Sequence, residues 1–356
     1  HARASANGVD DIHRLERAAV LAREPQLADD VAAALLVPGE HLVDPWSAPL
    51  AYLTQAVANG AKLRRRTAVE TGSFDGRAWS LTTTGGTVRA GALVNAAGLF
   101  GDRLEQRLMG DCDFEIRPRK GQFVVFDKAA AALLRTTLLP VPTERTKGVV
   151  VARTIFGNLL VGPTAEEQAE REHARVDTAT LRALVERAER MLPGLAGMPV
   201  TATYAGLRPA SEAKPYRVRF EPERAYLRLG GIRSTGLTAA LGLAEHAADR
   251  LREIGIGGAP LAEPVWPTVP NLAEHRPRPW QGSEGGDIVC HCERVTRGEI
   301  LRALEGPLAA GDLGGLKRRT RVMLGRCQGF YCGAAVARLT AERWEGSLAL
   351  AEPARA

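Results

Sequence analysis

Residues 288–296 read IVCHCERVT, and residues 325–335 read GRCQGFYCGAA. These two short segments hold four of the five cysteines of a 356-residue chain, in the pattern C-x-C-x34-C-x4-C. Four thiolates from two loops can surround a zinc ion or a [2Fe–2S] cluster. Zinc sites usually have two residues between paired cysteines, so a C-x-C pair is less usual for zinc. The spacing therefore predicts a metal centre, with iron–sulfur favoured and zinc still open.

Disulfides are the other use of paired cysteines, and the rest of the sequence argues against them. The first residues, HARASANGVDDIH, contain no apolar segment typical of a secretory signal. No run of the sequence approaches the ~18 consecutive apolar residues of a membrane helix. We therefore expect a reducing, cytoplasmic setting, in which paired cysteines hold metal more often than they form disulfides.

The composition is that of an ordinary globular protein, with 45% hydrophobic and 25% charged residues. The formal net charge is +6, but the arginines are scattered along the chain rather than clustered on one element. This distribution favours an Arg-rich enzyme over a nucleic-acid-binding protein. At ~100–200 residues per domain, the length allows two or three domains.

The first third of the chain alternates helix and strand signals. Apolar residues at helical spacing predict a helix over residues 47–60, with Ser47 as its cap. Residues 79–90 read WSLTTTGGTVRA, in which two adjacent glycines mark a hairpin turn. A short apolar strand over residues 92–94 leads into the small-residue turn 96–98 and a second helix.

The middle of the chain is rich in strand patterns over residues 116–164, followed by a strongly periodic helix over residues 178–192. A further strand, AYLRLGG, precedes a helix that Ser234 or Thr235 can cap. The expected buried stripe of that helix comprises Leu237, Leu241, Ala244, Ala248 and Leu251.

Residues 256–287 are rich in proline and glycine and indicate a linker or wrapping segment. A compact cysteine-bearing module follows, small enough to need a metal for its stability. The predicted fold class is α+β.

The cysteine-bearing module resembles the bacterioferritin-associated-ferredoxin-like [2Fe–2S] domain over about residues 287–345. That family has a C-x-C loop followed by V-T-x-x-E-I, a K-x-R-T-R run and G-x-C-Q-G-x-x-C. The resemblance implies a [2Fe–2S] cluster held by four cysteines. The matching residues are Val295, Thr296, Glu299, Ile300, Lys317, Arg319, Thr320, Arg321, Gly325, Cys327, Gln328, Gly329 and Cys332, and the implied ligands are Cys290, Cys292, Cys327 and Cys332.

Elementary electrostatics agrees with this resemblance. A four-thiolate cluster is anionic, and the helix that Cys332 opens would direct its positive dipole end toward it. Nearby basic residues would add positive charge. A nucleic-acid patch is the competing explanation of these residues, but it lacks the interleaved aromatic residues typical of single-strand binding. The basic residues are Lys317, Arg318, Arg319, Arg321 and Arg326.

A one-electron carrier attached to a larger domain implies a redox partner in that domain, and a flavin is the usual choice. The expected G-x-G-x-x-G after a first strand is absent from the sequence. GDLGGL at residues 311–316 is the nearest glycine-rich run, but it follows no predicted strand.

The remaining segments resemble the FAD-dependent D-amino-acid-oxidase-type superfamily over about residues 8–255. They include LVNAAGLFGDRL, RPRKGQFVVFDK, YAGLRPAS and GIRSTGLTAALGLAEHAADRL. The nearest resemblance is to its glycerol-3-phosphate-dehydrogenase-like and L-2-hydroxyglutarate-oxidase-like branch. Several members of that branch carry the ferredoxin-like domain at the C-terminus. Members begin with a strand, the dinucleotide glycine loop and a helix, so we expect this chain to be an N-terminally truncated portion.

The resemblance implies a partial FAD domain of Rossmann type, an antiparallel substrate-binding sheet and the small helical cluster module. The expected division places the remainder of the FAD domain at residues 1–115 and the substrate sheet at 116–205. The chain would return to the FAD domain at 206–255, with a linker at 256–286 and the cluster module at 287–345.

Two turns are the predicted flavin contacts. Ala97 and Gly98 follow an apolar strand, where small side chains permit close approach of a nucleotide, although a tight turn without ligand explains them too. Val69 matches the family position that meets the adenine, but by itself it is more typical of a core residue. A turn between two glycines leads into a helix N-terminus, which suits the anionic edge of a reduced flavin. Its residues are Gly231, Ile232, Ser234, Thr235, Gly236 and Leu237.

Arg208 is the foremost predicted substrate ligand. A guanidinium can hold a carboxylate or phosphate with two hydrogen bonds, and the family resemblance places this residue against the substrate anion. A structural ion pair is the competing role. Lys120 and Tyr204 are further candidates for which a structural role is favoured, and Arg233 can serve substrate or flavin. The catalytic base is unknown, because none of the available histidines, His41, His173, His246 and His291, lies in a motif that demands one.

The sequence thus predicts an FAD-dependent dehydrogenase that oxidises a small anionic CH–OH substrate, such as glycerol 3-phosphate or a 2-hydroxy acid. Electrons would pass singly through the [2Fe–2S] cluster to an acceptor protein or partner subunit, which could place the chain peripherally at the inner face of the membrane. The alternatives are a non-catalytic protein for electron transfer or scaffolding, an amino-acid (CH–NH) oxidase or dehydrogenase, and a zinc-stabilised binding module. No nucleic-acid partner is expected.

Overall fold

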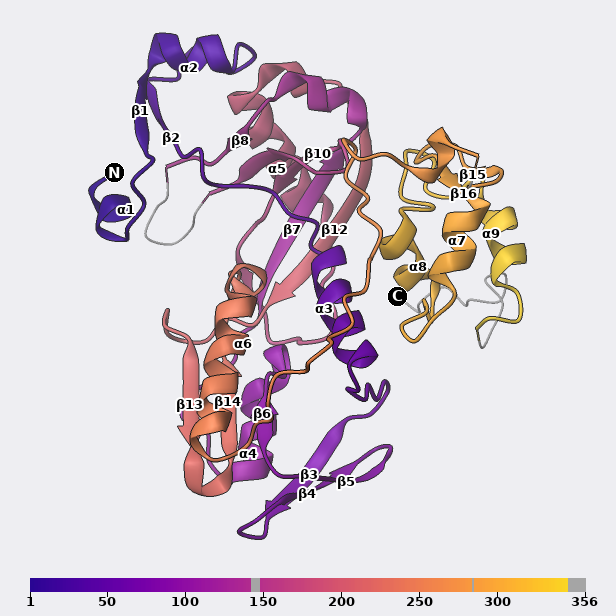
Figure 1. Ribbon diagram of the computed structural model, residues 1–356. Helices are drawn as coiled ribbons and strands as arrows, with labels where there is room; N and C mark the ends of the chain where they lie inside the picture. Colours follow the sequence, from indigo (N-terminus) through magenta and orange to yellow (C-terminus); the bar gives the residue numbers. More distant parts are fainter. Residues whose placement is uncertain (142–147, 284, 345–356) are drawn as a thin grey trace.

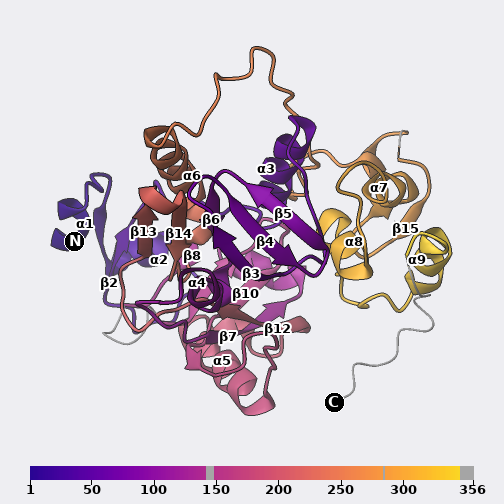
Figure 2. The same cartoon turned by 90° about the horizontal axis from the view of Figure 1, so that it is seen from below.

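The computed structural model describes residues 1–141, 148–283 and 285–344. They form a large antiparallel sheet crossed by one helix, a smaller sheet between two helices, and a C-terminal module that lies to one side in both views (Figures 1 and 2). No helix in the described residues is both long and apolar enough to cross a membrane. The α+β fold class predicted from the sequence is confirmed.

Strand β7, Arg119–Phe126, is the centre of the large sheet because it has hydrogen-bonded neighbours along both edges. Strand β12, Val200–Arg208, pairs along one edge. Strands β10, Leu159–Gly162, and β11, Glu166–Glu167, share the other edge. The sheet continues through β9, Val150–Arg153, to β8, Thr137–Leu138, and every pairing in it is antiparallel.

Helix α5, Thr178–Met191, covers one face of this sheet. Its buried Leu184 and Ala188 pack with Val124 and Phe126 of β7 in the main hydrophobic core. Side chains alternate between the two faces of a strand, so Arg119, Gly121 and Phe123 point to the face opposite α5.

A second, three-stranded sheet lies beside the first. Strand β14, Tyr226–Gly230, runs antiparallel to β13, Arg217–Glu221, and parallel to β6, Leu93–Asn95. Helices α4, Gly101–Met109, and α6, Gly236–Glu253, flank this sheet (Figure 1). Because β6 and β14 are parallel, their carboxyl ends meet at one edge of the sheet.

The remaining N-terminal elements form two peripheral sheets. Strands β3, Val69–Phe74, β4, Trp79–Thr83, and β5, Gly86–Ala90, form an antiparallel meander. Its buried Trp79 and Leu81 pack with Leu108 and Tyr226, which joins the meander to the second sheet. The other sheet pairs β1, His13–Glu16, with β2, Ala33–Leu36, and lies next to α1, Ala2–Ala6, and α2, Arg17–Arg23.

Residues 256–283 form a strap that runs from α6 along helix α3, Ser47–Ala58, to the C-terminal module (Figure 1). Asn59, just after α3, exchanges two hydrogen bonds with the backbone of Val265, of 2.9 and 2.8 Å. Farther along, the amide of Glu274 donates to the carbonyl of Ile155 at 2.8 Å. The predicted wrapping segment is therefore bound along its course.

The C-terminal module has two short strands and three helices around its own core. Strand β15, Ile288–Cys290, pairs with β16, Val295–Thr296, and α7, Arg297–Ala303, begins at a capping box formed by Thr296 and Glu299. The other helices are α8, Leu313–Thr320, and α9, Gly333–Thr340. The core buries Cys290 and Cys332 beside apolar side chains.

Most predicted elements are present, but three local predictions are wrong. Ser47 is the first residue of α3 and not its cap, because its hydroxyl donates to Asp44. Neither Ser234 nor Thr235 caps α6 with its side chain. The expected buried stripe of α6 is not buried in the described structure: Leu241 is 63% exposed, because no described segment packs over that side of the helix.

A buried ion pair fixes the start of α4. Asp102 accepts two hydrogen bonds from Arg171, of 2.6 and 2.9 Å, and the same guanidinium donates to the carbonyls of Leu99 and Ile116. Burial alone would raise the pKa of Asp102, but the hydrogen bonds from Arg171 and from two backbone amides leave this pKa below its usual value.

Replacing Arg171 by methionine should therefore lower the free energy of unfolding by about 3 kcal/mol or more at pH 7, since Asp102 would remain buried without its cation. Asp102 stabilises the wild-type protein above the usual aspartate pKa range, and this contribution is lost as pH falls through its lowered folded pKa. In the variant the unpaired carboxyl of Asp102 takes up a proton more readily. The difference in the free energy of unfolding between the two proteins should therefore shrink toward pH 4. Urea unfolding at both pH values measures this difference.

The exposed pair of Arg117 and Glu115 offers the matched control. Arg117→Met should change the free energy of unfolding by less than about 1 kcal/mol. Equal effects of the two substitutions would contradict the role assigned to Arg171.

Candidate functional site

The four predicted ligand cysteines lie together in the module. Cys290 ends β15, Cys292 lies in the following turn, Cys327 lies in the loop after α8, and Cys332 immediately precedes α9. Their thiols meet as two pairs, Cys290 with Cys332 and Cys292 with Cys327, and each pair acts electrostatically on the other. The first pair is buried and the second is partly exposed.

This pairing fits a two-iron cluster better than a single zinc ion. A tetrahedral zinc site holds its sulfurs about 3.8 Å apart. All four cysteines belong to the described part of the chain, yet no three of their thiols lie within 4.8 Å of one another. A [2Fe–2S] cluster takes two thiolates at each iron. Here each pair of thiols would bind one iron, and each pair combines one cysteine of the first loop with one cysteine of the second.

The surroundings of the thiols differ between the pairs. Backbone N–H groups of Tyr331, Gly329 and Phe330 lie near the sulfur of Cys327 and lower the pKa of this thiol, and the Phe330 amide also donates to the carbonyl of Cys327 at 3.0 Å. Burial, together with the neighbouring Cys290, raises the pKa of Cys332 to about 12. The Cys332 thiol therefore favours its protonated form until a cation binds it, and metal binding there releases a proton.

Gly325 allows the two cysteine loops to approach each other. A Cβ atom on Gly325 would lie 2.3 Å from the Cβ of Cys292, which is far inside van der Waals contact. The glycine of the G-x-C motif is therefore required by the packing of one loop on the other.

The cluster module is joined to the large sheet by a seam of charged side chains. Arg321 is buried, donates to Glu293 at 2.7 Å and to Asn158 at 3.3 Å, and lies 4.1 Å from the ring centre of Phe156. Lys128 lies 3.2 Å from the same Glu293 carboxylate. A third contact, from Arg326 to the buried Asp127 at 2.7 Å, reaches the residue that directly follows β7.

The basic residues expected near the cluster divide into two groups. Arg321 and Arg326 flank the cysteine loop and take part in the seam. Arg319 instead donates to the carbonyls of Gly315 and Leu308, and its pKa is lowered by burial and by Arg318. The sequence therefore identifies the basic character of the module, while only part of that charge adjoins the cysteines.

The two predicted flavin turns lie at the same edge of the second sheet. Ala97 and Gly98 follow β6, Gly231 follows β14, and the carboxyl ends of these parallel strands adjoin. The side chain of Asn95 fixes the first turn by accepting from the amide of Ala97 and donating to the carbonyl of Gly101. Gly98 and Gly231 both have positive φ, of 55° and 64°. Ligands of open α/β sheets bind at such an edge.

The N-terminus of α6 opens toward this edge without a side-chain cap. Thr235 precedes the helix, but its hydroxyl is hydrogen-bonded to Tyr216. The first amides of an 18-residue helix are thus without a side-chain acceptor, which suits an anionic group. These features fit the flavin edge predicted for Gly231, Ile232, Ser234, Thr235, Gly236 and Leu237.

Val69 lies apart from these turns. It begins β3, pairs with Thr83 of β4 and packs against the core around Trp79. The structure therefore assigns its side chain a packing role, while its backbone remains at the start of the peripheral meander.

The predicted substrate arginine lies on the open face of the large sheet. Arg208 is directly opposite Arg119 in the pairing of β12 with β7. Among the residues that the structure describes, the guanidinium of Arg208 donates only to the carbonyls of Lys120 and Thr164, at 3.3 and 2.6 Å, and its buried Nε has no partner there. Burial and the nearby Arg119 lower the pKa of Arg208.

Arg233 converges on the same place from the second sheet. It donates to the backbone carbonyls of Ser211 and Ala213, just beyond the end of β12, and its buried Nε also lacks a partner. Burial and Arg119 lower its pKa as well. Arg119 therefore lies near both guanidiniums, and it pairs with Glu167 at 3.1 Å, whereas neither Arg208 nor Arg233 makes an ion pair within the described residues.

The other two substrate candidates separate. Tyr204 shares the open face with Arg208, and its ring stacks on Phe123 with centres 4.8 Å apart. Lys120 points to the opposite face, where its ammonium lies 3.1 Å from Glu166. The structure thus groups Arg208, Tyr204 and Arg233, and it leaves Lys120 in an ion pair on the core side.

Histidines do not join this face in the part of the chain that the structure describes. The four histidines considered as bases, His41, His173, His246 and His291, are all exposed. The catalytic base therefore stays unassigned.

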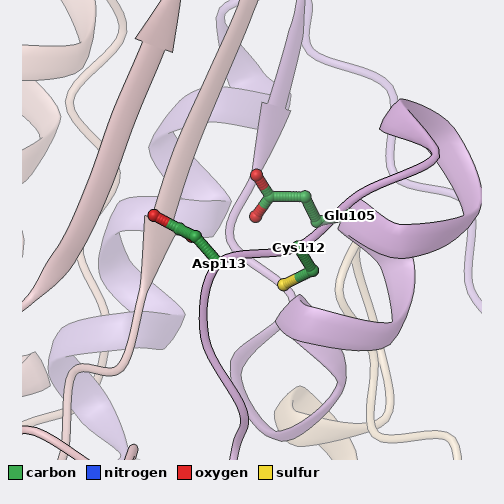
Figure 3. A group of neighbouring side chains, drawn as sticks. All are labelled: Glu105, Cys112 and Asp113. Carbon is green, nitrogen blue, oxygen red and sulfur yellow. The ribbon is translucent and has the colours of Figure 1, made fainter.

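A carboxylate–thiol group lies beneath the second sheet, formed by Glu105, Cys112 and Asp113 (Figure 3). Arg228 donates to Glu105 and to Asp113, each at 2.6 Å, so its guanidinium takes the place that a metal cation would need. Burial raises the pKa of Glu105, and Arg228 acts against this rise. The fifth cysteine thus belongs to a structural ion cluster.

Comparison with known families agrees with the two-part organisation. A family model described as FAD dependent oxidoreductase matches residues 1–250. A second model, described as a BFD-like [2Fe-2S] binding domain, matches residues 288–342. FAD and a [2Fe–2S] cluster are therefore the cofactors of the two matching families, as the sequence predicts.

Individual relatives point to glycerol 3-phosphate enzymes. The chain is 28% identical to a glycerol 3-phosphate dehydrogenase of Caloramator mitchellensis over 94% of its own length and 71% of the relative's. It is 30% identical to the glycerol 3-phosphate oxidase of Mycoplasma pneumoniae, over 67% of this chain and 64% of that one. The FAD-bound structure of that oxidase superposes with a TM-score of 0.64, at 28% identity, over 70% of this chain and 67% of the other.

A further relative is one of the subunits of the anaerobic glycerol-3-phosphate dehydrogenase of Escherichia coli, 26% identical over 89% of this chain and 65% of the relative. The chain thus spans about two thirds of the length of these relatives.

Sequence reasoning missed Arg119 and the seam residues Asn158 and Phe156. Arg119 was visible in RPRKG, but only the strand register shows that it, and not Lys120, shares a face with Arg208. No local pattern distinguishes Asn158 or Phe156 from other loop residues.

Replacing Gly325 by alanine should prevent assembly of the cluster, because the added methyl group would overlap Cys292. We expect iron content to fall from two atoms per chain toward zero, with loss of the visible absorption of the cluster. Iron assay and absorption spectroscopy after anaerobic reconstitution measure both.

Gly333→Ala is the matched control. A Cβ at this position, which directly follows Cys332, would meet only Met323 at 3.9 Å. Full iron content in Gly325→Ala, or equal loss in both variants, would show that the loop contact is not required.

Proposed function

The chain belongs to the FAD dependent oxidoreductase family and carries a BFD-like [2Fe–2S] binding domain, and from this premise we propose that it oxidises glycerol 3-phosphate or a closely related anionic CH–OH compound. Electrons from the flavin would reach the [2Fe–2S] cluster and leave through it. The proposal keeps the domain division predicted from the sequence, with the substrate sheet at 116–205 and the cluster module at 287–345.

The convergence of Arg119, Arg208 and Arg233 carries this proposal. Like charges directly opposite on neighbouring strands destabilise a sheet, yet Arg119 and Arg208 occupy such positions. A dianion such as a phosphate monoester would relieve the repulsion and satisfy the unpartnered Nε atoms of Arg208 and Arg233. Arg119 already pairs with Glu167 at 3.1 Å, so Arg208 and Arg233 are the two guanidiniums of this group without an anionic partner in the described residues. Two such cations match the two charges of a phosphate monoester better than the single charge of a carboxylate, which favours a phosphate ester over an amino acid.

The open face would orient the substrate. Gly206 lies opposite Gly121 between the arginine end and the stacked Phe123–Tyr204 pair. No atom lies within 4 Å of a Cβ built on Gly206, so there is space above it. Anchoring of the phosphate by the arginines would hold the carbinol carbon over this space, and such positioning is a large part of hydride-transfer catalysis. When bound, FAD supplies the hydride acceptor.

A partner chain fits this scheme. The Escherichia coli relative is named as one subunit of an anaerobic glycerol-3-phosphate dehydrogenase, and a cluster module at the side of the fold is suited to deliver electrons to another chain. We therefore propose that this chain is one component of a larger redox assembly.

Anaerobic reconstitution tests the proposal. The protein, loaded with FAD, iron and sulfide, should lose its oxidised flavin absorption when sn-glycerol 3-phosphate is added. L-2-Hydroxyglutarate and glycine serve as competing substrates of the carboxylate class. Bleaching by glycine in preference to glycerol 3-phosphate would replace the proposed function with that of an amino-acid oxidase.

Replacing Arg208 by methionine should raise the glycerol 3-phosphate concentration needed for half-maximal bleaching by about 30-fold or more, equivalent to ~2 kcal/mol. The reason is the loss of a partly buried guanidinium that has no other anionic partner. Titration of flavin absorbance against substrate measures the shift. Arg208→Lys should recover part of the affinity.

Arg89→Gln is the control, because Arg89 is exposed and pairs with Asp75 in the peripheral meander. It should leave the titration unchanged. An Arg208→Met titration identical to that of the wild type would show that the anion binds elsewhere.

A further inference from the structure

The loop between the last two cysteines presents two aromatic rings to solvent. Phe330 and Tyr331 are 84% and 78% exposed, and they contact each other edge-to-face with centres 5.2 Å apart. The amide of Phe330 donates inward to the carbonyl of Cys327 at 3.0 Å, and the Tyr331 amide lies near the sulfur of the same residue. The inward amides explain the loop backbone but do not require aromatic side chains.

Exposed aromatic pairs of this kind are typical of the energetic centre of a protein–protein contact. Neither ring packs in the core of the module. Their position matters because they lie between Cys327 and Cys332, so a protein that covers them approaches the partly exposed thiol pair of Cys292 and Cys327 directly.

The exposed charges of the two cysteine-bearing segments have one sign. In residues 288–298 and 323–340, which carry all four cysteines, Glu293 is the only acidic residue, and it is buried and paired with Arg321 and Lys128. The exposed ionisable side chains of these segments are His291, Arg294, Arg297, Arg326 and Arg338, of which Arg326 is already paired with Asp127.

We propose that Phe330 and Tyr331, with the surrounding arginines, form the docking surface for an acidic electron-transfer protein. This inference rests on the proposed function, because it names where electrons leave the chain. At each encounter the reduced cluster would lose one electron, and a one-electron acceptor cofactor of the partner would gain it. Two encounters would complete the oxidation of one substrate molecule.

Charge complementarity selects the partner. A second copy of this chain would bring arginines against arginines, which disfavours a symmetric dimer through this surface. A partner with carboxylates around an apolar hollow would pair with the exposed arginines and receive the two rings. Such pairing accelerates association and makes it sensitive to salt.

Binding of a model acidic carrier tests the surface without substrate or flavin turnover. The full chain, loaded with its cluster, is titrated calorimetrically with an oxidised plant-type [2Fe–2S] ferredoxin, which is acidic, and separately with a basic cytochrome c. We expect binding to the ferredoxin at about 20 mM salt, at least tenfold weaker binding at about 200 mM salt, and no binding to the cytochrome. This titration does not depend on glycerol 3-phosphate oxidation. Failure of the proposed function can therefore be distinguished from failure of the proposed docking surface.

The double variant Phe330→Ala/Tyr331→Ala should bind the ferredoxin at least about tenfold more weakly. Trp266→Ala is its control, since Trp266 is a 75% exposed aromatic residue of the strap, and it should bind as the wild type does. If the double variant does not hold two irons per chain, the variant Arg294→Glu/Arg338→Glu is used in its place. It should also bind the ferredoxin at least about tenfold more weakly than the wild type.

Three results would overturn the proposal. The first is ferredoxin binding by the iron-loaded variants within twofold of wild type. The second is equal or tighter binding of the basic cytochrome c. The third is self-association of the wild type that the double variant abolishes, which would assign the surface to a second copy of the chain.

Discussion

The pairing register of β7 with β12 is the constraint on which both candidate sites depend. It places Arg119 opposite Arg208, Gly121 opposite Gly206 and Phe123 opposite Tyr204. These residues share the open face because the alternate residues Gln122, Val124 and Phe126 of β7 are buried toward α5. A slip of one residue would exchange the two faces and expose the core. Burial of the apolar face therefore fixes the arginine pair on the other face.

The two ends of β7 have different roles. Arg119 begins the strand opposite Arg208, and Asp127, which follows the strand, accepts a hydrogen bond from Arg326 of the cysteine loop. Seven or eight residue steps of roughly 3.3 Å separate the ends by about 25 Å. The anion site and the cluster module therefore do not touch. The open face between them carries Gly206 and the stacked Phe123–Tyr204 pair.

The sequence predicts the local features of this molecule better than its long-range contacts. The cysteine spacing, the Gly85-Gly86 hairpin and the helix over 178–192 depend on neighbours in the chain, and the structure contains all three elements. The capping predictions for Ser47 and Thr235 are wrong because each hydroxyl has a different partner, Asp44 and Tyr216. The faces of Arg119 and Lys120 depend on a strand about 80 residues away in the chain, so no local pattern could assign them.

The charges in the seam between the cluster module and the sheet suggest a structural role for the cofactor in addition to electron transfer. Three cations, Lys128, Arg321 and Arg326, meet two carboxylates, Glu293 and Asp127, in a partly buried contact. Burying charge is costly unless it is compensated, and the protein side chains alone leave one positive charge in excess. Glu293 directly follows the predicted ligand Cys292, and Arg326 directly precedes the predicted ligand Cys327, so an anionic four-thiolate cluster would lie beside this excess charge. Loading of the cluster and docking of the module on the sheet would therefore stabilise each other.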